Sequence, residues 1–188
     1  MFMRHSSAGT LELLLYVDDI IVTVTQSSVI TRFIRSLWNK FDMKDLGDLH
    51  YFLGMEASRS STGLRLTQSK YALGLLSQIY LVGAKPCSTP VACCSKFSAT
   101  DGDLLPDATL YRRIVGSLQY LTLTRPDITY AVNQVCQFMH KPRTAHMVAV
   151  KRILRYIKGS LDYGLFFRPA PCTSLTQGSW KHRSSALS

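Results

Sequence analysis

Acidic residues are scarce in this sequence. Its 188 residues include 12 aspartates and glutamates against 22 lysines and arginines, which gives a formal net charge of +10. This excess favours an anionic partner, chiefly nucleic acid or an acidic membrane surface, although a basic protein without such a partner fits it as well. Hydrophobic residues make up 46% of the chain and charged residues 18%. That composition excludes a disordered chain and predicts one folded domain or slightly more.

Long apolar runs and a regular cysteine pattern are also missing. No run reaches the roughly 18 apolar residues of a membrane helix, and the first ten residues have no apolar core of signal-peptide length. The five cysteines are odd in number and irregularly spaced, without a Cys-x-x-Cys pair. We therefore expect reduced thiols in an intracellular protein that is not secreted. Cytoplasm and nucleus both fit this expectation, and so does a mitochondrial location.

Three residues, Cys136, His140 and His146, have a spacing that loosely resembles a metal site. Zinc would need further ligands of this kind, and no second cysteine pair is present. We expect Cys136 to be a small buried apolar side chain instead.

The first half of the chain predicts β-hairpins and two helices. The apolar runs Leu11–Val17 and Ile20–Thr25 are separated only by Asp18 and Asp19, which is the pattern of a hairpin with a two-residue polar turn. Apolar residues then recur at helical spacing. After them, one strand with its return and a second helix follow. The predicted segments are a helix over 27–41, a strand over Leu49–Glu56, its return over 64–68 and a helix over 69–81 that ends near Gly83.

The second half reads as helical after an irregular stretch, Lys85 to Asp107, which is rich in proline and small polar residues. Pro126 can open a helix because a first-turn proline loses no needed hydrogen bond. Thr144 is a candidate N-cap of the last helix, and Gly159 is its stop. The predicted segments are helices over 109–123, 126–140 and 144–159, and a strand over 163–167 that leads into a new region of the fold.

A basic face lies on the last predicted helix. Lys151, Arg155 and Lys158 follow the spacing i, i+4, i+7, and apolar residues take the other side. Such a helix can dock on the fold and present its charges to phosphates, or it can be an ordinary solvated surface helix.

The two adjacent aspartates of the first hairpin are the strongest candidates for chemistry. Carboxylates are costly to bury without partners. Placed at the end of a rigid hairpin, Asp18 and Asp19 offer hard oxygen ligands of the kind that Mg²⁺ prefers. Two-metal sites of this type drive phosphoryl transfer in polymerases and nucleases. An aspartate pair is also a good turn former in its own right, so the pair alone leaves both interpretations open.

Several longer segments resemble the reverse transcriptase of copia-type long-terminal-repeat retrotransposons, over roughly Leu11 to Pro169 and in the expected order. They are also similar to short plant mitochondrial proteins derived from such elements. The segments are "YVDD", "FDMKDLGDLHYFLGMEASRSSTGLRLTQSKYALGLL", "KPCSTPV", "YRRIVGSLQYLTLTRPDITYAVNQVCQFMHKP" and "HMVAVKRILRYIKGS".

The resemblance implies a role for each matching residue. Asp18 and Asp19 match catalytic, metal-binding carboxylates on the palm hairpin, where Mg²⁺ or Mn²⁺ is the cofactor. Tyr16 and Val17 match residues that line the template–primer. The second hairpin resembles the primer grip, whose residues here are Tyr51, Phe52, Leu53 and Gly54. The implied partners are an RNA or DNA template–primer and, in the complete enzyme, a deoxynucleoside triphosphate; no membrane is implied.

The sequence also departs from the family pattern. The family uses a third metal-binding aspartate well upstream of the hairpin, whereas the only acid before Asp18 here is Glu12. From the resemblance, we do not expect the fingers within these residues either. No acid follows Asp162, so the ribonuclease H site is not expected. We therefore expect a polymerase fragment that is inactive alone, which could associate with a fuller polymerase copy. The alternative is a non-catalytic, basic nucleic-acid-binding remnant or a pseudogene product.

The predicted fold class is α+β, a partial palm of antiparallel hairpins followed by helical thumb and connection segments. The predicted domains are a partial palm with primer-grip hairpin and start of the thumb over 1–83, a linker over 84–108, a helical connection over 109–169, and a disordered or divergent tail over 170–188.

Overall fold

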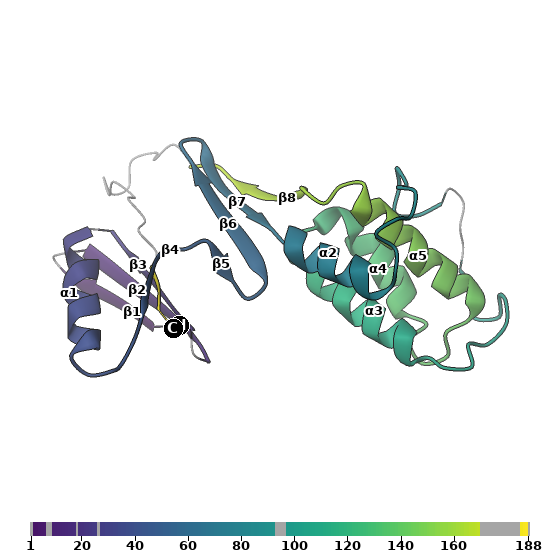
Figure 1. Ribbon diagram of the computed structural model, residues 1–188, viewed down its shortest axis with the longest axis horizontal. Helices are drawn as coiled ribbons and strands as arrows, with labels where there is room; N and C mark the ends of the chain where they lie inside the picture. The colour runs from purple at the N-terminus through teal and green to yellow at the C-terminus, as the bar shows by residue number, and fades with distance from the viewer. Residues whose placement is uncertain are drawn as a thin grey trace. The chain divides into compact units, whose positions relative to one another are not determined.

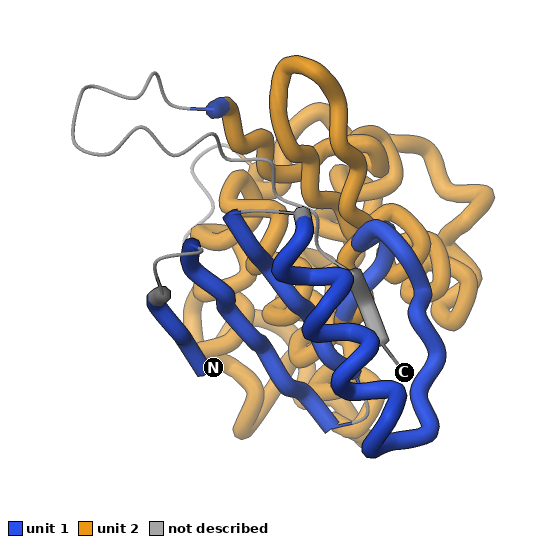
Figure 2. Tube along the Cα trace, turned by 90° about the vertical axis from the view of Figure 1, so that its left-hand side faces the viewer, with its two compact units in different colours: residues 1–52, 169–188 blue, residues 53–168 orange. Residues whose placement is uncertain are grey.

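The computed structural model describes residues 2–6, 9–17, 19–25, 27–92, 97–169 and 185–187. Its contacts divide the chain into two compact units, which Figure 2 colours separately: unit 1, residues 1–52 with 169–188, and unit 2, residues 53–168. Both contain helices and antiparallel strands, so the predicted α+β class is confirmed. No helix in the part of the chain that the structure describes is long and apolar enough to cross a membrane.

Unit 1 is an antiparallel sheet with one helix packed against it (Figure 1). Its core is formed by Val22 and Val24 from the sheet and by Ile30 and Ile34 from the helix, all at most 8% exposed. The strands in spatial order are β1 (Phe2–Ser6), β2 (Gly9–Tyr16), β3 (Asp19–Val24), β9 (Ser185–Leu187) and β4 (Asp45–Asp48), and the helix is α1 (Ser27–Trp38).

The β2–β3 hairpin and α1 confirm the predictions from apolar periodicity, but β1, β4 and β9 were not predicted. The sequences of these three strands are "FMRHS", "DLGD" and "SAL". None has the apolar alternation of a half-buried strand, so pairing with neighbouring strands decides their conformation. Of the predicted tail, only β9 belongs to the described residues.

The single strand predicted over Leu49–Glu56 is wrong, because the chain turns in its middle. β5 (Tyr51–Phe52) ends at Phe52, and β6 (Met55–Ser60) begins three residues later. Leu53 and Gly54 between them have φ values of +47° and +72°. This left-handed backbone is easy for glycine and costly for leucine, and two such residues in succession are typical of a tight hairpin turn.

Unit 2 contains a second sheet, in which β7 (Gly63–Thr67) lies between β6 and β8 (Gly164–Phe167). The strand predicted over 163–167 is confirmed, but it does not enter a new region. It pairs with β7 and returns the chain to the sheet (Figure 1). Gly164 permits this close pairing, because a Cβ atom there would overlap the carbonyl oxygen of Leu66.

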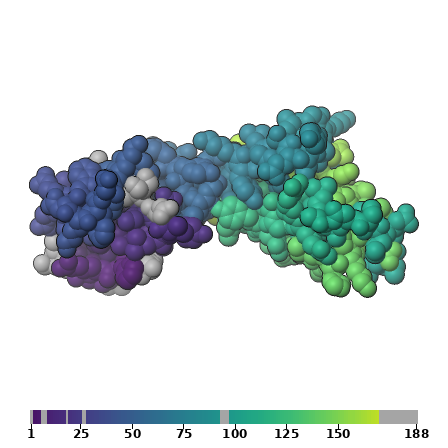
Figure 3. Space-filling model, turned by 60° about the horizontal axis from the view of Figure 1, so that its bottom comes forward, coloured from purple at the N-terminus to yellow at the C-terminus, as the bar shows by residue number. Residues whose placement is uncertain are grey.

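The rest of unit 2 is a helical bundle whose core includes the fully buried Tyr111, Leu118, Val132 and Leu154. Figure 3 shows the outer atoms of these helices, in teal and green, as one continuous surface. The four helices predicted within unit 2 are confirmed with shorter bounds, and the third of them begins as a 3₁₀ turn. The elements are α2 (Ser69–Gln78), α3 (Thr109–Leu121), the 3₁₀ turn η1 (Pro126–Ile128), α4 (Thr129–Cys136) and α5 (Thr144–Lys158).

The ends of α5 confirm one prediction and correct another. Gly159 is the C-cap, as expected. Thr144 is not the N-cap but the first helical residue, and the extended residue before it, Arg143, takes that place. The Thr144 hydroxyl instead accepts a hydrogen bond from the Asp103 amide at 3.2 Å, a partner that local sequence cannot reveal.

Candidate functional site

The β2–β3 hairpin places the candidate catalytic residues at its tip. Tyr16 and Asp19 form its last residue pair, so Asp19 is already the first residue of β3 and the predicted turn at Asp18 and Asp19 is wrong by one residue. Val17 has a φ of +51° and is 85% exposed. Asp18 lies outside the described residues. The Asp19 side chain is half-buried.

Apolar packing holds this tip in place. Val22 is fully buried and Val24 is 1% exposed, and both pack against Ile30 and Ile34 of α1. A one-residue slip of β3 would move this apolar set to the other face of the sheet. The hairpin register, and with it the position of Asp19, is therefore fixed by the small core of unit 1.

Tyr16 also contacts a residue of the predicted primer grip. Its ring lies 6.4 Å from the ring of Phe52, centroid to centroid, at an interplanar angle of 78°. Phe52 is 8% exposed, whereas the neighbouring Tyr51 is 52% exposed. An edge-to-face pair of this kind is a favourable aromatic contact. Within unit 1, the structure thus brings the hairpin tip beside the strand that carries two of the four grip residues.

The other two grip residues, Leu53 and Gly54, belong to unit 2, where both lie against Tyr120. The Tyr120 hydroxyl donates a hydrogen bond to the carbonyl oxygen of Leu53. A Cβ atom on Gly54 would come within 3.2 Å of that hydroxyl oxygen. α3 therefore supports the turn between β5 and β6 directly, and glycine suits Gly54 for its conformation as well as for this space.

The donor chemistry of the hairpin tip fits a divalent cation, since a carboxylate oxygen is the ligand that Mg²⁺ prefers. Among the described residues, no group of three or more histidines, cysteines and acids lies together so as to hold a metal. Glu12 does not complete such a group. It is the cross-strand partner of Thr23 and lies four residues along β2 from Tyr16, so its backbone is about 13 Å from the Tyr16–Asp19 pair. Of the described residues, Asp19 is the candidate ligand.

The basic face predicted on α5 has partners within unit 2. The Arg155 guanidinium donates to the carbonyl oxygen of Lys85 at 2.7 Å, and the Lys158 ammonium to that of Ala84 at 2.5 Å. Arg152, which follows Lys151 on the same helix, donates a hydrogen bond to the Thr89 hydroxyl at 2.8 Å. These side chains hold the segment after α2 against α5. Lys151 is exposed. Of the three residues predicted to contact phosphates, Arg155 and Lys158 are thus held by hydrogen bonds to the backbone, and Lys151 is the one whose side chain is exposed to solvent.

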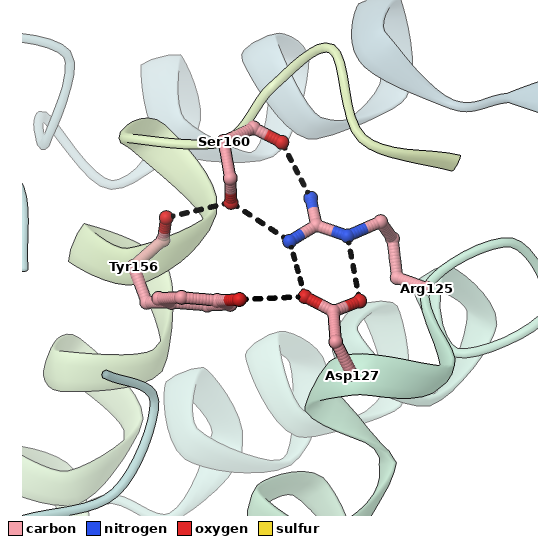
Figure 4. A network of polar contacts seen from close by, with 4 residues as sticks. All are labelled: Arg125, Asp127, Tyr156 and Ser160. Carbon is pink, nitrogen blue, oxygen red and sulfur yellow. Dashed lines mark hydrogen bonds and ion pairs between the residues drawn. The ribbon is translucent and has the colours of Figure 1, made fainter. Parts of the chain in front are cut away.

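A polar network that sequence reasoning missed lies where η1 meets the end of α5 (Figure 4). Arg125 is 3% exposed, and its guanidinium makes a bidentate pair with Asp127 at 2.9 and 2.8 Å. It also donates to the carbonyl and hydroxyl oxygens of Ser160, both at 2.8 Å. The Tyr156 hydroxyl donates to Asp127 at 2.9 Å.

The charge of Asp127 is stabilised by this network. Burial acts to raise the pKa of its carboxyl, but the hydrogen bonds from Arg125 and Tyr156 outweigh burial and hold the pKa below its ordinary value. The sequence signal was the tripeptide Arg-Pro-Asp at a helix start. It could predict the local pair but not Ser160, which lies 35 residues from Arg125.

Two of the three residues whose spacing loosely resembles a metal site, Cys136 and His146, take part in packing. Cys136 is half-buried against the helical core, and burial raises the pKa of its thiol. His146 is fully buried, and each of its ring nitrogens lies 3.0 Å from a backbone partner, the Arg143 amide or the Ser98 carbonyl. Its ring also stacks on Phe138 at 3.8 Å. The His146 nitrogens are therefore already used in packing α5 against the segment before α3.

Residues 1–93, which include the hairpin tip and β5, match the family model described as "Reverse transcriptase (RNA-dependent DNA polymerase)". The chain is 45% identical, over 93% of its length, to a retrovirus-related Pol polyprotein from transposon RE1 of Arabidopsis thaliana. It is 43% identical over the same share to the polyprotein from transposon RE2 of that plant. An uncharacterized mitochondrial protein of Arabidopsis thaliana is 47% identical over 82% of the chain.

Residues 1–93 match the reverse transcriptase family, and most of the chain is similar to plant retrotransposon Pol polyproteins. The resemblance to retrotransposon polymerases predicted from its motifs is thereby confirmed. The chain spans 12% of the length of each of the two polyproteins and 64% of the length of the mitochondrial protein. No solved structure matches it with statistical significance.

Proposed function

We propose that the chain is part of the polymerase of a copia-type retrotransposon, with Asp18 and Asp19 as catalytic, metal-binding carboxylates. The observation that carries this proposal is the placement of Asp19 at the tip of a rigid hairpin, within the residues that match the reverse transcriptase family. In the complete enzyme, the reaction adds deoxynucleotides to a primer 3′ end along an RNA or DNA template.

Bound Mg²⁺ or Mn²⁺ would stabilise the charge that develops during phosphoryl transfer. The protein's own part is positioning. Asp18 and Asp19 would supply hard oxygen ligands, and the Val22–Val24 packing fixes the point from which Asp19 projects. A small displacement of such ligands costs a large share of the rate, because this chemistry depends on alignment.

We assign the residues beside the hairpin tip and the grip residues to contacts with the template–primer. Tyr16 and Val17 would contact the template–primer beside the carboxylates. The grip residues, Tyr51 to Gly54, would hold the primer end. Support comes from the Tyr16–Phe52 ring contact within unit 1 and from the turn at Leu53 and Gly54, which α3 supports within unit 2. In the same proposal, residues after Ser69 form the thumb and those after Thr109 the connection.

These 188 residues are proposed to be inactive on their own. Reverse transcriptases use a third carboxylate, and the only other acid before Asp18, Glu12, lies about 13 Å along β2 from the Tyr16–Asp19 pair. Activity would then need a carboxylate from additional polypeptide, such as a fuller polymerase copy. The protein is proposed to act inside the cell, in the cytoplasm, nucleus or mitochondria, without a membrane.

Primer extension tests this assignment. The purified chain with a labelled primer–template, Mg²⁺ and all four deoxynucleotides should give no extension above background. Extension that depends on Mg²⁺ and disappears with Asp19→Asn would refute the proposed inactivity and confirm the metal role. Asp42→Asn, the same change at an exposed aspartate of unit 1, is the matched control.

A second candidate function is binding of nucleic acid without catalysis, as by a remnant of the polymerase. The observation that favours it is the distribution of charge. Residues 53–168 contain 15 lysines and arginines against six acids, a net charge of +9, so the rest of the chain carries only +1. Retained binding to a primer–template that Asp19→Asn leaves unchanged, without any extension, would support this candidate.

A further inference from the structure

We propose that β7 and β8 form a stacking platform for unpaired bases of single-stranded nucleic acid, a site that rests on the nucleic-acid binding proposed above. The platform consists of Phe166 with Tyr163, Arg65 and Arg168. These residues lie in unit 2, outside both the catalytic hairpin and the basic face of α5.

Strand register brings the central pair together. Phe166 on β8 is the direct cross-strand partner of Arg65 on β7, and the two strands run side by side in Figure 1. Directly opposite residues of an antiparallel pair project from the same face of the sheet. Gly164 allows the close approach of the two strands. The ring and the guanidinium therefore share one face without depending on loop geometry.

The aromatic rings are open to solvent although they are large and apolar. Tyr163 is 54% exposed and Phe166 is 46% exposed. Both line a groove of about 620 Å³, together with Arg65. The Arg125 guanidinium lies 5.3 Å from the Tyr163 ring centroid, so the network of Figure 4 holds that ring in place. An ordered, half-exposed ring is well prepared to stack on a flat partner.

Positive charge surrounds the rings. The Arg168 guanidinium lies 5.9 Å from the centroid of Phe166, and Arg65 flanks it on the neighbouring strand. The two acids that line the groove each have an arginine beside them. Asp127 pairs with Arg125 at 2.8 Å, and the Asp162 carboxylate lies 4.0 Å from Arg65. The Asp127 carboxylate is therefore neutralised, whereas the Asp162 carboxylate, whose side chain is 81% exposed, is offset only weakly by Arg65.

Exposed rings between cations match the chemistry of an unpaired nucleotide. Every base has a flat π-face that can stack on Phe166, and arginines can contact the backbone on either side. Bases inside a duplex are already stacked on one another and cannot reach the ring. The excess of 15 basic over six acidic residues in 53–168 attracts the same ligand over a longer range. The occupant we assign is a short unpaired stretch of nucleic acid.

The test uses the full chain and a fluorescent single strand of about 15 nucleotides, with a duplex of the same length as comparison. Anisotropy titrations between about 50 and 200 mM salt give the affinity and its salt dependence. Phe166→Leu should weaken single-strand binding about tenfold with an unchanged salt slope, and duplex binding should not change. Arg168→Gln should reduce the slope by about one ionic contact.

Two further variants act as controls. Tyr130→Leu removes an aromatic ring that is 68% exposed on α4 and does not line the groove, and it should leave single-strand affinity unchanged. Phe166→Trp keeps a stacking face and should bind at least as well as the parent, which excludes loss of folding as the cause of the leucine result.

The outcomes separate this proposal from the one it rests on. A parent chain that binds no single strand would overturn both. A parent that binds, with Phe166→Leu unaffected or matched by Tyr130→Leu, would overturn the platform alone. An equal loss on duplex would do the same, because it would show contact with the backbone only. Reduced self-association of Phe166→Leu in sedimentation, with nucleic-acid affinity unchanged, would identify the surface as a protein contact instead.

Discussion

Replacing Arg125 with methionine should destabilise unit 2 and leave unit 1 unaffected. Methionine fills much of the same volume but cannot donate any of the four hydrogen bonds that the guanidinium makes to Asp127 and Ser160. The carboxylate of Asp127 would then keep the Tyr156 hydroxyl but lose its counter-charge. The carbonyl oxygen of Ser160 would lose a buried donor, which adds a desolvation cost.

The expected loss follows from the burial of the pair. Removing one partner of a buried ion pair costs about 3–5 kcal/mol, because the other charge stays in place without compensation. Arg125 is almost fully buried, whereas the Asp127 side chain is 33% exposed, so water can solvate the remaining carboxylate in part. We therefore expect a loss at the lower end, about 3 kcal/mol, which is a large fraction of the 5–15 kcal/mol that is typical of a folded domain.

Urea unfolding can resolve the two units because the tryptophans are unevenly placed. Both of them, Trp38 and Trp180, lie outside residues 53–168. Tryptophan fluorescence therefore has no source in unit 2, and its described source is Trp38 on α1 of unit 1. Far-ultraviolet circular dichroism is dominated by the helices of unit 2. In Arg125→Met, the dichroism midpoint should fall by about 1–3 M urea, and the fluorescence midpoint should not move. Arg113→Met, a change at an exposed arginine of α3, should shift neither midpoint measurably.

Two results would refute this reasoning. A loss below about 1 kcal/mol would show that water replaces the guanidinium at little cost, so the network would be a surface feature in solution. An equal fall of the fluorescence and dichroism midpoints would show that the two units unfold together, and a local account of the loss would then be wrong.

Two further predictions concern the same unit. Because the hydrogen bonds from Arg125 and Tyr156 outweigh burial and lower the pKa of Asp127, its contribution to stability is complete above about pH 4 and is lost as the pH falls through the lowered value. Asp127→Asn should therefore flatten the acid side of the stability curve, measured as dichroism urea midpoints over a pH series; an unchanged acid slope would assign it to other groups. Arg155→Gln should lower stability by about 1 kcal/mol through the lost bond to Lys85. Lys151→Gln should leave the urea midpoint unchanged but reduce the salt slope of nucleic-acid binding by about one contact, and identical behaviour of the two variants would contradict the different roles assigned here.

Sequence reasoning was reliable where one segment decides its own conformation. The runs beside Asp18 and Asp19 predicted β2 and β3, and local sequence patterns predicted the α-helices of the described residues. The turn was wrong by one residue because Val17 adopts a left-handed conformation, which is unfavourable for a β-branched residue and which no local propensity predicts. The turn at Leu53, which interrupts the predicted strand, also has a left-handed backbone. The hydrogen bond that supports this turn comes from Tyr120, 67 residues away, so local sequence could not predict it.

The site residues were harder to predict because their partners are distant in sequence. The spacing of Arg155 and Lys158 correctly placed both on one helix face. What covers that face depends on the segment after α2, whose carbonyl oxygens lie more than 60 residues earlier in the chain. The pairing of Phe166 with Arg65 depends in the same way on β8 returning to β7. A helical or strand pattern defines a face, whereas tertiary packing decides what that face contacts.

The positive charge of unit 2 has two uses that composition cannot distinguish. Among the described residues of unit 2, at least six lysines and arginines donate hydrogen bonds to backbone carbonyl oxygens, namely Arg65, Arg112, Arg125, Arg143, Arg155 and Lys158. A carbonyl oxygen neutralises no charge, so these side chains still contribute to the field that attracts a polyanion from a distance. Their positions are nevertheless fixed by the fold, which limits the phosphates they can approach. Long-range attraction therefore depends on all 15 cations and close contact on fewer, so Lys151 and Arg155, four residues apart on one helix, should respond differently to the same substitution.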